Sequence, residues 1–254
     1  MKHKGTSALR AFINIHPQIQ TAPQEVNFFD RYYNRGLNWY INQMPYLFVN
    51  QIAIEKTPAY FTSNRVNVAK LIHQMNPKIK LILLVKNPVE RTISDYAQIL
   101  HNKKVKFNSD SYDEFSKQFE EKILNEGGKI KKFNNYIYNS LYIVHLKRWL
   151  EYFPIEQFLI LSGDELVLNP YIIVRKVELF LNLTKFITKD RFEYSEKKGF
   201  MCIKNIKIKR LECLNESKGR TRPFIAPHII DKLKEFYKPY DEEFFKTIKQ
   251  NPFW

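Results

Sequence analysis

The sequence has few acidic side chains and no long apolar run. Its 26 Asp and Glu residues are outnumbered by 41 Lys and Arg residues, which gives a formal net charge of +15. No run of about 18 apolar residues occurs, so no segment is long enough to span a membrane as a helix. The first residues lack the apolar core of a signal peptide. No helix-turn-helix, zinc-finger or RNA-binding motif directs the positive charge to nucleic acid.

Apolar and basic residues are what the sequence does contain. Hydrophobic residues make up 44% and aromatic residues 15% of the 254 residues, enough to fill a sizeable core. A positive surplus of this size usually indicates a polyanionic partner, such as a nucleic acid, an acidic membrane surface, a sulfated glycan or a phosphorylated cofactor. A lysine-rich surface in a chain of biased composition would give the same surplus. The charge therefore predicts a class of partner and not one partner.

Helix and strand patterns alternate along the chain. Apolar spacing predicts helices over 6–15, 66–77, 89–100, 138–154 and 169–183, and in the second of these Val66, Leu71, Ile72 and Met75 are expected to face inward. Short apolar runs predict strands over 52–54, 80–86 and 157–163, the middle one buried on both faces. This alternation indicates the α/β class, with a parallel sheet covered by helices. The charged, Asn-rich stretch 102–135 is expected to be a surface excursion.

Two segments could bind an anion beyond the carboxyl ends of such strands. Gly5-Thr6-Ser7 reads as a turn that presents N–H groups at the start of the first helix, where the helix dipole favours a phosphate. It lacks the full P-loop pattern of nucleotide hydrolases, and an ordinary helix start would look the same. In the second segment Lys86 ends a strand and Ser94 lies one to two turns into the next helix. A cation and a hydroxyl could meet there on one phosphate, although a surface lysine and a helix serine would explain this segment equally well.

The combination of segments is more informative than any one of them. The sequences KGTSAL, EVNFFD, IEKTPAYF, VKNPVERTISDY, YFPIEQFLILSGDEL, GFMC and SKGR occur in this order. Their order and spacing resemble the heparan sulfate glucosamine 3-O-sulfotransferase family over nearly the whole chain. The resemblance implies a single sulfotransferase domain over residues 1–254, with a P-loop-like parallel sheet flanked by helices. It also implies PAPS (3′-phosphoadenosine 5′-phosphosulfate) as the sulfuryl donor and a glucosamine in a heparan sulfate chain as the acceptor.

The resemblance assigns roles on the acceptor side of the reaction. Glu25 matches the family's general base, Asp30 a second acidic residue that helps to arrange the site, and Lys56 a lysine close to the acceptor. The chemistry agrees, because an alcohol is a poor nucleophile and sulfuryl transfer needs a base to accept its proton. Gln98 matches a side chain that contacts the glycan. Asn27 takes a substrate-binding position that the family fills with histidine.

Other roles concern the cofactor, and no metal is implied. The segment that matches the 5′-phosphosulfate loop comprises Lys2, His3, Lys4, Gly5, Thr6, Ser7 and Ala8. Lys86 and Ser94 match the pair that binds the 3′-phosphate. Phe200 would approach the adenine. A basic loop that would close over nucleotide and glycan comprises Lys218, Gly219 and Arg220.

The phosphosulfate segment departs from the family's pattern. The catalytic lysine falls at His3, a loop glycine at Lys4 and a loop arginine at Ser7, although Lys2 or Lys4 could take the lysine's role. Lysine at position 86 replaces the usual arginine, which keeps the charge but loses the bidentate fork and should lower nucleotide affinity. The central strand that should precede the loop has no counterpart in the sequence. An N-terminal truncation is therefore expected, with any membrane anchor outside this chain.

The two cysteines and two short motifs bear on the cellular compartment. Cys202 and Cys213 match a pair that forms a disulfide in the family, although two buried thiols would show the same spacing. A cross-link of this loop length adds about 3 kcal/mol by restricting the unfolded chain. Asn182-Leu183-Thr184 and Asn215-Glu216-Ser217 match the glycosylation sequon, which also arises by chance. Together with the implied disulfide they favour the Golgi lumen.

Three classes of function stay open. An active 3-O-sulfotransferase is the leading interpretation, because Glu25, Lys56 and Ser94 are retained. A catalytically weak relative that still binds heparan sulfate is the second, since His3 and Asn27 replace family residues while the positive charge remains. A nucleic-acid-binding protein is the third, which the charge allows but no motif supports. Nucleotide-dependent stabilisation would separate the first two from the third, and sulfate incorporation would separate the first from the second.

Overall fold

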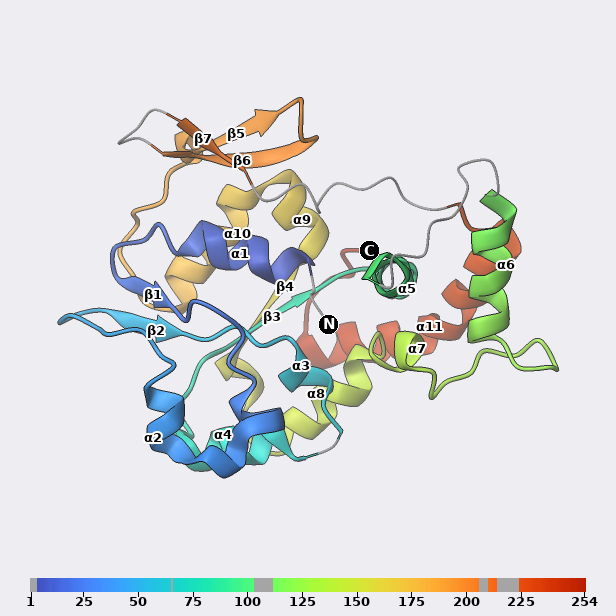
Figure 1. Ribbon diagram of the computed structural model, residues 1–254, viewed down its shortest axis with the longest axis horizontal. Coiled ribbons are helices and arrows are strands. Elements are labelled where there is room, and N and C mark those ends of the chain that lie inside the picture. The colour runs from blue at the N-terminus through green and yellow to red at the C-terminus, as the bar shows by residue number, and fades with distance from the viewer. Residues whose placement is uncertain (1–3, 65, 103–111, 206–209, 214–223) are drawn as a thin grey trace. The chain divides into compact units, whose positions relative to one another are not determined.

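The computed structural model describes residues 4–64, 66–102, 112–205, 210–213 and 224–254 (Figure 1). The chain divides into two compact units, residues 1–85 with 149–219 and residues 86–148 with 220–254. Each unit is therefore built from two separated stretches of sequence. The single domain expected over residues 1–254 stays a prediction.

Two pairs of parallel strands form the centre of the first unit (Figure 1). β1 (Ile19–Thr21) pairs with β2 (Ile52–Ile54), and Ile19 lies opposite Ile52. β3 (Leu81–Val85) pairs with β4 (Phe158–Ser162), and Leu81 lies opposite Phe158. Parallel neighbours need long crossover connections, and helical segments lie within both of them. The predicted α/β class is confirmed, although the described parallel strands form two pairs and not one continuous sheet.

Strand β3 is less buried than its apolar sequence predicted. Its residues 81–84 are half-buried, and Val85 alone is fully buried. Among the described residues β4 is its one hydrogen-bonded neighbour, so β3 lacks the cover that a central strand of a larger sheet receives.

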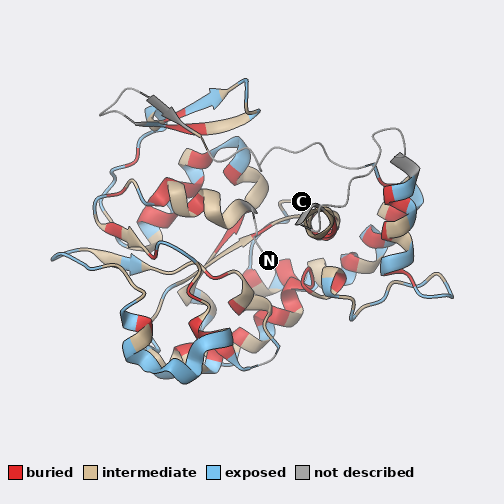
Figure 2. Ribbon diagram, viewed as in Figure 1, coloured by how far each residue is buried: buried red, intermediate tan, exposed pale blue. Residues whose placement is uncertain are grey.

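Helical segments surround these strands in the first unit. They are α1 (Lys4–Ile13), η1 (Phe28–Tyr32), η2 (Tyr33–Arg35), α2 (Gly36–Ile41), α3 (Ala59–Thr62), α4 (Val68–Met75), η3 (Ile155–Gln157), α9 (Gly163–Leu168), α10 (Pro170–Phe180) and η4 (Lys189–Arg191). One apolar cluster joins α1, β4 and α10 and includes Leu9 and Leu161. A second joins η1, α2 and α4 and includes Phe28, Tyr40 and Ile72. Figure 2 shows exposed residues gathered over α2.

The boundary of α4 differs from the predicted helix over 66–77. Asn67 caps the helix, because its side chain accepts a hydrogen bond from the Lys70 N–H at 3.0 Å. The helix therefore begins at Val68. Val66 precedes the cap and is 41% exposed, so the expectation that it faces inward is wrong, whereas Ile72 is buried as expected.

A three-stranded antiparallel sheet completes the first unit, and the apolar patterns did not predict it. Its strands lie in the order β5 (Phe192–Ser195), β6 (Phe200–Asn205) and β7 (Arg210–Glu212). Gly199, with a φ of 69°, makes the turn before β6, and its N–H donates to the Ser195 carbonyl at 2.8 Å. Cys202 of β6 forms a disulfide with Cys213, which confirms the implied pairing.

Helices make up most of the described second unit. They are α5 (Pro88–Asn102), α6 (Tyr112–Ile123), α7 (Asn135–Tyr138), α8 (Tyr142–Leu150) and α11 (Pro227–Ile248), of which α8 runs on into the first unit. The helix expected over 138–154 is present as α8 but is shorter, since α7 ends at Tyr138 and α8 covers only Tyr142–Leu150. No helix in the described ranges, α11 included, is long and apolar enough to cross a membrane.

The surface excursion expected over 102–135 is wrong for α6. Phe115, Phe119 and Ile123 recur at four-residue spacing, which places them on one face of the helix, and all three are buried. They belong to one apolar cluster with Tyr96 of α5 and Leu233 of α11. The charged residues between them hid this periodicity in the sequence.

Candidate active site

Glu25 and Lys56 form an ion pair in the first unit. Glu25 follows β1 and Lys56 follows β2, so the parallel pairing of these strands brings the two residues to the same edge. The Lys56 Nζ contacts the Glu25 Oε1. The side chains remain 14% and 22% exposed, so the pair is partly buried without being sealed from a substrate. The two residues predicted to act on the acceptor are thus in direct contact.

Asn27 and Asp30 lie on the segment that continues from Glu25. The Asn27 side-chain amide donates to the Glu25 carbonyl at 2.9 Å, and the Asn27 backbone is left-handed with a φ of 53°. Asparagine adopts this conformation more readily than most residues do. Asp30 lies in the first turn of η1 with its side chain 8% exposed, and its Oδ2 is 3.6 Å from the Arg31 Nε. All four predicted acceptor-side residues of the first unit therefore lie on adjoining segments.

Residues 4–8 of the predicted phosphosulfate segment form the first turns of α1. Because α1 begins at Lys4, Gly5, Thr6 and Ser7 are helical, and the turn expected before the helix is wrong for these residues. A Cβ on Gly5 would lie 2.7 Å from the Leu84 Cδ2, so glycine lets the helix start close to β3. The first N–H groups of a helix have no acceptor within it, and the positive end of the dipole lies there. The arrangement suits an anion.

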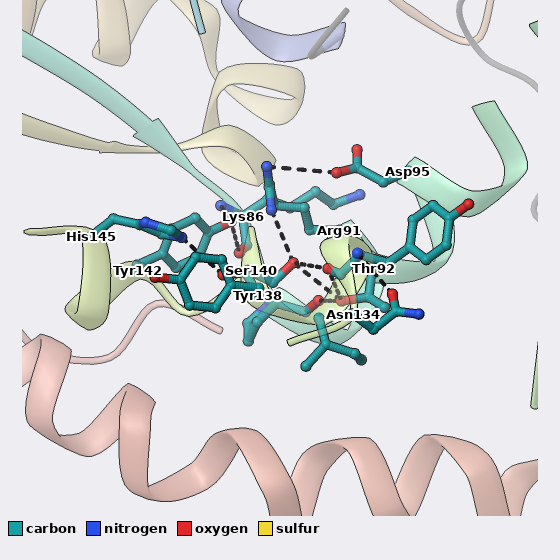
Figure 3. Close-up of polar contacts among 12 residues, drawn as sticks. Lys86, Arg91, Thr92, Asp95, Asn134, Tyr138, Ser140, Tyr142 and His145 are labelled. Atoms are coloured by element: carbon teal, nitrogen blue, oxygen red, sulfur yellow. Dashed lines mark hydrogen bonds and ion pairs between the residues drawn. The ribbon is translucent and has the colours of Figure 1, made fainter. Parts of the chain in front are cut away.

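Lys86 is the first residue of the second unit and follows β3 directly. Tyr142 holds its backbone from both sides, because the Tyr142 Oη accepts from the Lys86 N–H at 3.1 Å and donates to the Lys86 carbonyl at 2.8 Å (Figure 3). Burial raises the pKa of Tyr142 to about 12. The Lys86 Nζ lies 2.7 Å from the Glu90 Oε2 in an ion pair between residues four apart in the sequence. The lysine predicted to bind the 3′-phosphate thus has a carboxylate at its ammonium group.

Ser94 and Gln98 share one face of α5. They are four residues apart, which places them one above the other on a helix, and both are half-buried. Asn87 starts this helix by accepting the N–H groups of Val89 at 3.0 Å and Glu90 at 3.3 Å. The cap fixes where α5 begins and hence where Ser94 lies along it.

A buried polar network supports the start of α5 (Figure 3). The Arg91 Nη1 donates to the Ser140 Oγ at 3.0 Å, and the Arg91 Nη2 lies 3.6 Å from the Asp95 Oδ2. The Thr92 Oγ1 lies 3.1 Å from the Ser140 Oγ. Burial, together with nearby Arg148 and Arg91, lowers the pKa of His145 to about 4. His145 is therefore neutral at physiological pH and helps to support the fold.

The remaining predicted residues are only partly described. Phe200 begins β6 and is half-buried, next to the exposed Gly199. The residues that lie outside the described ranges are Lys2, His3, Lys218, Gly219 and Arg220, and the side chain of Lys4 is likewise not described. In the described part of the chain, no group of three or more His, Cys, Asp and Glu residues could hold a metal ion.

Sequence reasoning missed Glu55. It precedes Lys56 in the same motif, yet its carboxyl group points into the protein and accepts hydrogen bonds from Tyr40, Thr57 and Tyr60. The alternation of β2 gave no signal for it, because Glu55 would continue on the face of Ala53, which is the exposed residue of the strand. Nothing in the sequence showed which hydroxyl groups would meet it.

Comparison with known proteins shows which family the chain belongs to. The sulfotransferase domain family matches residues 1–251. The human protein named heparan sulfate glucosamine 3-O-sulfotransferase 5 is 38% identical over 254 residues, which cover 98% of this chain and 70% of the relative. The human 3-O-sulfotransferase 6 is 38% identical over 256 residues, which cover 100% of this chain and 71% of the relative. The chain therefore belongs to the sulfotransferase family, and within it to the heparan sulfate glucosamine 3-O-sulfotransferases.

A solved structure supports the fold independently. The crystal structure of a sulfotransferase from Alicyclobacillus acidocaldarius matches 98% of this chain and 92% of its own, with a TM-score of 0.67 and 18% sequence identity. At this identity the likeness concerns the fold alone. The predicted family and fold class are thus confirmed, while the roles of individual residues stay predictions.

The Tyr142 contacts generate a first prediction. Tyr142→Phe removes the hydroxyl that pairs both backbone groups of Lys86, and unpaired buried groups cost about 1–3 kcal/mol. We expect the free energy of unfolding, measured by urea denaturation, to fall by about that amount. The control is Tyr152→Phe, since the Tyr152 Oη accepts only an exposed hydrogen bond from Asn67, and we expect a change within about 0.5 kcal/mol. Equal losses in the two variants would contradict the role of Tyr142.

Proposed function

We propose that this chain transfers the sulfuryl group of PAPS to the 3-hydroxyl of a glucosamine residue in heparan sulfate. The observation that carries the proposal is the contact between Glu25 and Lys56 at the ends of two parallel strands. It occurs in a chain 38% identical to relatives named for this activity. A carboxylate and an ammonium group, both partly buried and side by side, are the groups that activation of an acceptor hydroxyl requires.

On the acceptor side, Glu25 accepts the proton of the 3-hydroxyl. Lys56, which contacts the same carboxylate, places a positive charge beside the oxygen that becomes negative as its proton leaves. Asn27 holds the segment through its hydrogen bond to the Glu25 carbonyl, and Asp30 adds a second carboxylate on the same segment. The net charge of +15 suits a sulfated polyanion such as heparan sulfate, and Gln98 is the proposed glycan contact on α5.

On the donor side, the residues present are hydrogen-bond donors and cations, which fits a phosphorylated cofactor. The N–H groups at the start of α1 would hold the 5′-phosphosulfate, and Lys86 with Ser94 would hold the 3′-phosphate. Phe200 would lie near the adenine. When bound, PAPS supplies the sulfuryl group, and its bond to the bridging phosphate oxygen breaks as the acceptor oxygen takes that place.

A Golgi location belongs to the same proposal. The disulfide between Cys202 and Cys213 is stable in an oxidising compartment. Asn182 and Thr184 of one sequon are exposed, as a glycosylation site requires, while Asn215 of the other lies outside the described residues.

A catalytically weak, heparan-binding relative is the second candidate. The observation that favours it is Asn27, whose amide donates to the Glu25 carbonyl and cannot carry a proton as the family's histidine can. His3 also favours this candidate, because it falls at the position of the family's catalytic lysine. This candidate predicts retention on heparin without measurable sulfate transfer, which separates it from the proposed enzyme.

The Glu25→Gln substitution tests the mechanism. Glutamine keeps the shape of glutamate but cannot accept the proton, and loss of a general base typically lowers the rate about a hundred- to ten-thousandfold. We expect sulfate transfer to fall in that range while retention on a heparin column stays unchanged. The control is Glu165→Gln, because Glu165 also pairs with a lysine, Lys176, but on α9 and α10. Equal turnover in Glu25→Gln and wild type would remove Glu25 from the mechanism.

The ion pair at Lys86 generates a prediction about nucleotide affinity. The Glu90 carboxylate offsets the charge of Lys86 and repels a phosphate, so Glu90→Gln should make the site more positive. Both side chains are about one-third exposed, and pairs of this kind contribute up to about 1 kcal/mol, so we expect adenosine 3′,5′-bisphosphate to bind about two- to fivefold more tightly.

Titration calorimetry at fixed ionic strength measures this change. Glu114→Gln on α6 is the control, because it removes an exposed carboxylate from the same unit, and its dissociation constant should match wild type. Unchanged or weaker binding in Glu90→Gln would contradict a role of the Lys86 charge in binding the phosphate.

A further inference from the structure

We propose that Glu55 is a positioning residue for sulfuryl transfer, which ties the backbone of residues 27–29 to the end of β2 and so keeps Glu25 in contact with Lys56. The inference rests on the proposed function of Glu25 and Lys56. Glu55 itself touches neither substrate nor cofactor in this account. It acts through two hydroxyl groups, those of Thr57 and Tyr60.

The Glu55 carboxyl group receives three hydroxyl hydrogen bonds. The Thr57 Oγ1 donates to the Glu55 Oε1 at 2.7 Å, and the Tyr60 Oη donates to the same oxygen at 2.7 Å. The Tyr40 Oη donates to the Glu55 Oε2 at 2.8 Å. Because each hydroxyl has a single proton and directs it to Glu55, its oxygen remains available as an acceptor.

Two of these hydroxyl groups accept backbone N–H groups from the segment that follows Glu25. The Tyr60 Oη accepts the N–H of Phe28 at 2.8 Å and that of Phe29 at 3.3 Å. The Thr57 Oγ1 accepts the N–H of Asn27 at 3.4 Å. Glu55 therefore fixes three consecutive backbone N–H groups without contacting them.

These N–H groups need external acceptors. They stand at the start of η1, where a helix offers no internal partner, and the left-handed Asn27 makes the turn that leads into it. Glu25 precedes Asn27 by two residues, and Lys56 follows Glu55 directly. Both members of the ion pair are thus attached to backbone that the Glu55 carboxyl group holds.

The surroundings of Glu55 make the arrangement rigid. Phe28, Phe29, Tyr40 and Tyr60 are buried and pack ring against ring, with centroids 4.8 Å apart for Phe28 and Tyr40 and 5.6 Å apart for Phe29 and Tyr60. The pKa of Glu55 is raised, because the effect of burial outweighs that of the three hydroxyl hydrogen bonds, which lower it. The charge of Asp30 raises it further. A buried carboxyl group is costly where apolar residues could fill the space, which favours a role in the site over one in stability.

The test compares tyrosines that share the same carboxylate. Tyr60→Phe removes the hydroxyl that links Glu55 to the N–H groups of Phe28 and Phe29, whereas Tyr40→Phe removes a hydroxyl that donates to Glu55 and, among the described residues, accepts no N–H from residues 27–29. Misplacing a reacting group by about 1 Å can cost about a hundredfold in rate. We expect kcat to fall about ten- to hundredfold in Tyr60→Phe, with the KM for PAPS within about twofold, and to change less than about threefold in Tyr40→Phe.

A second pair of variants distinguishes a loss of positioning from misfolding. Thr57→Val removes the hydroxyl between Glu55 and Asn27 with little change in volume, and Thr57→Ser restores it. We expect Thr57→Val to lower kcat about tenfold and Thr57→Ser to recover to within about threefold of wild type. Thermal melting with and without adenosine 3′,5′-bisphosphate shows that each variant is folded and binds nucleotide, a readout that the positioning role does not alter.

The outcomes separate the two proposals. If wild type transfers sulfate and the Tyr60→Phe and Thr57→Val variants match their controls in kcat, Glu55 does not position the site and the proposed function stands. If wild type transfers no sulfate under conditions in which a human relative does, the proposed function fails and this inference fails with it. A loss of kcat confined to Tyr60→Phe and Thr57→Val supports both.

Discussion

The parallel pairing of β1 with β2 places the segments after both strands at one edge of the first unit. Ile19 lies opposite Ile52, and the ladder continues one step further because the Ala22 N–H donates to the Ile54 carbonyl at 2.9 Å. Glu25 lies three residues after Ala22 and Lys56 lies two residues after Ile54, so a different register would separate the segments that carry them. The ion pair at the candidate site therefore depends on the register of these two strands as well as on the chemistry of the side chains.

The second unit positions its candidate residues by a different means. Lys86 lies in the short connection between β3 and α5, and the Tyr142 hydroxyl from α8 holds its backbone. Asn87 then caps α5 and sets the position of Ser94 along the helix. In both units a buried hydroxyl group holds the backbone next to a charged residue, so the charged side chain can remain partly exposed.

Much of the fold was readable from the sequence, and the reasons are local. The apolar run over 80–86 predicted β3, and the Asn-Pro boundary after it predicted the start of α5. β1 was missed because its three residues, Ile19 to Thr21, include only one apolar side chain, whereas the equally short β2 is apolar throughout. The turn at residues 139–141 divides α7 from α8 without a proline or glycine to mark it.

The candidate site was predicted by resemblance more than by pattern. Glu25 alone is an ordinary loop carboxylate. Its contact with Lys56, which lies 31 residues later in the chain, depends on the pairing of β1 with β2. Glu55 was missed because its role depends on Tyr40 and Tyr60, which are brought to it by packing and not by spacing. The ion pair between Lys86 and Glu90 could have been inferred from their four-residue spacing at the start of a predicted helix.

The most direct measurement locates the sulfate that this chain adds. Heparan sulfate would be incubated with the protein and PAPS carrying radiolabelled sulfate, then cleaved to disaccharides and separated by sulfation position. If the chain is a 3-O-sulfotransferase, we expect the label on the 3-position of glucosamine. Label at another position, or none where a human relative assayed in parallel incorporates it, would contradict the account.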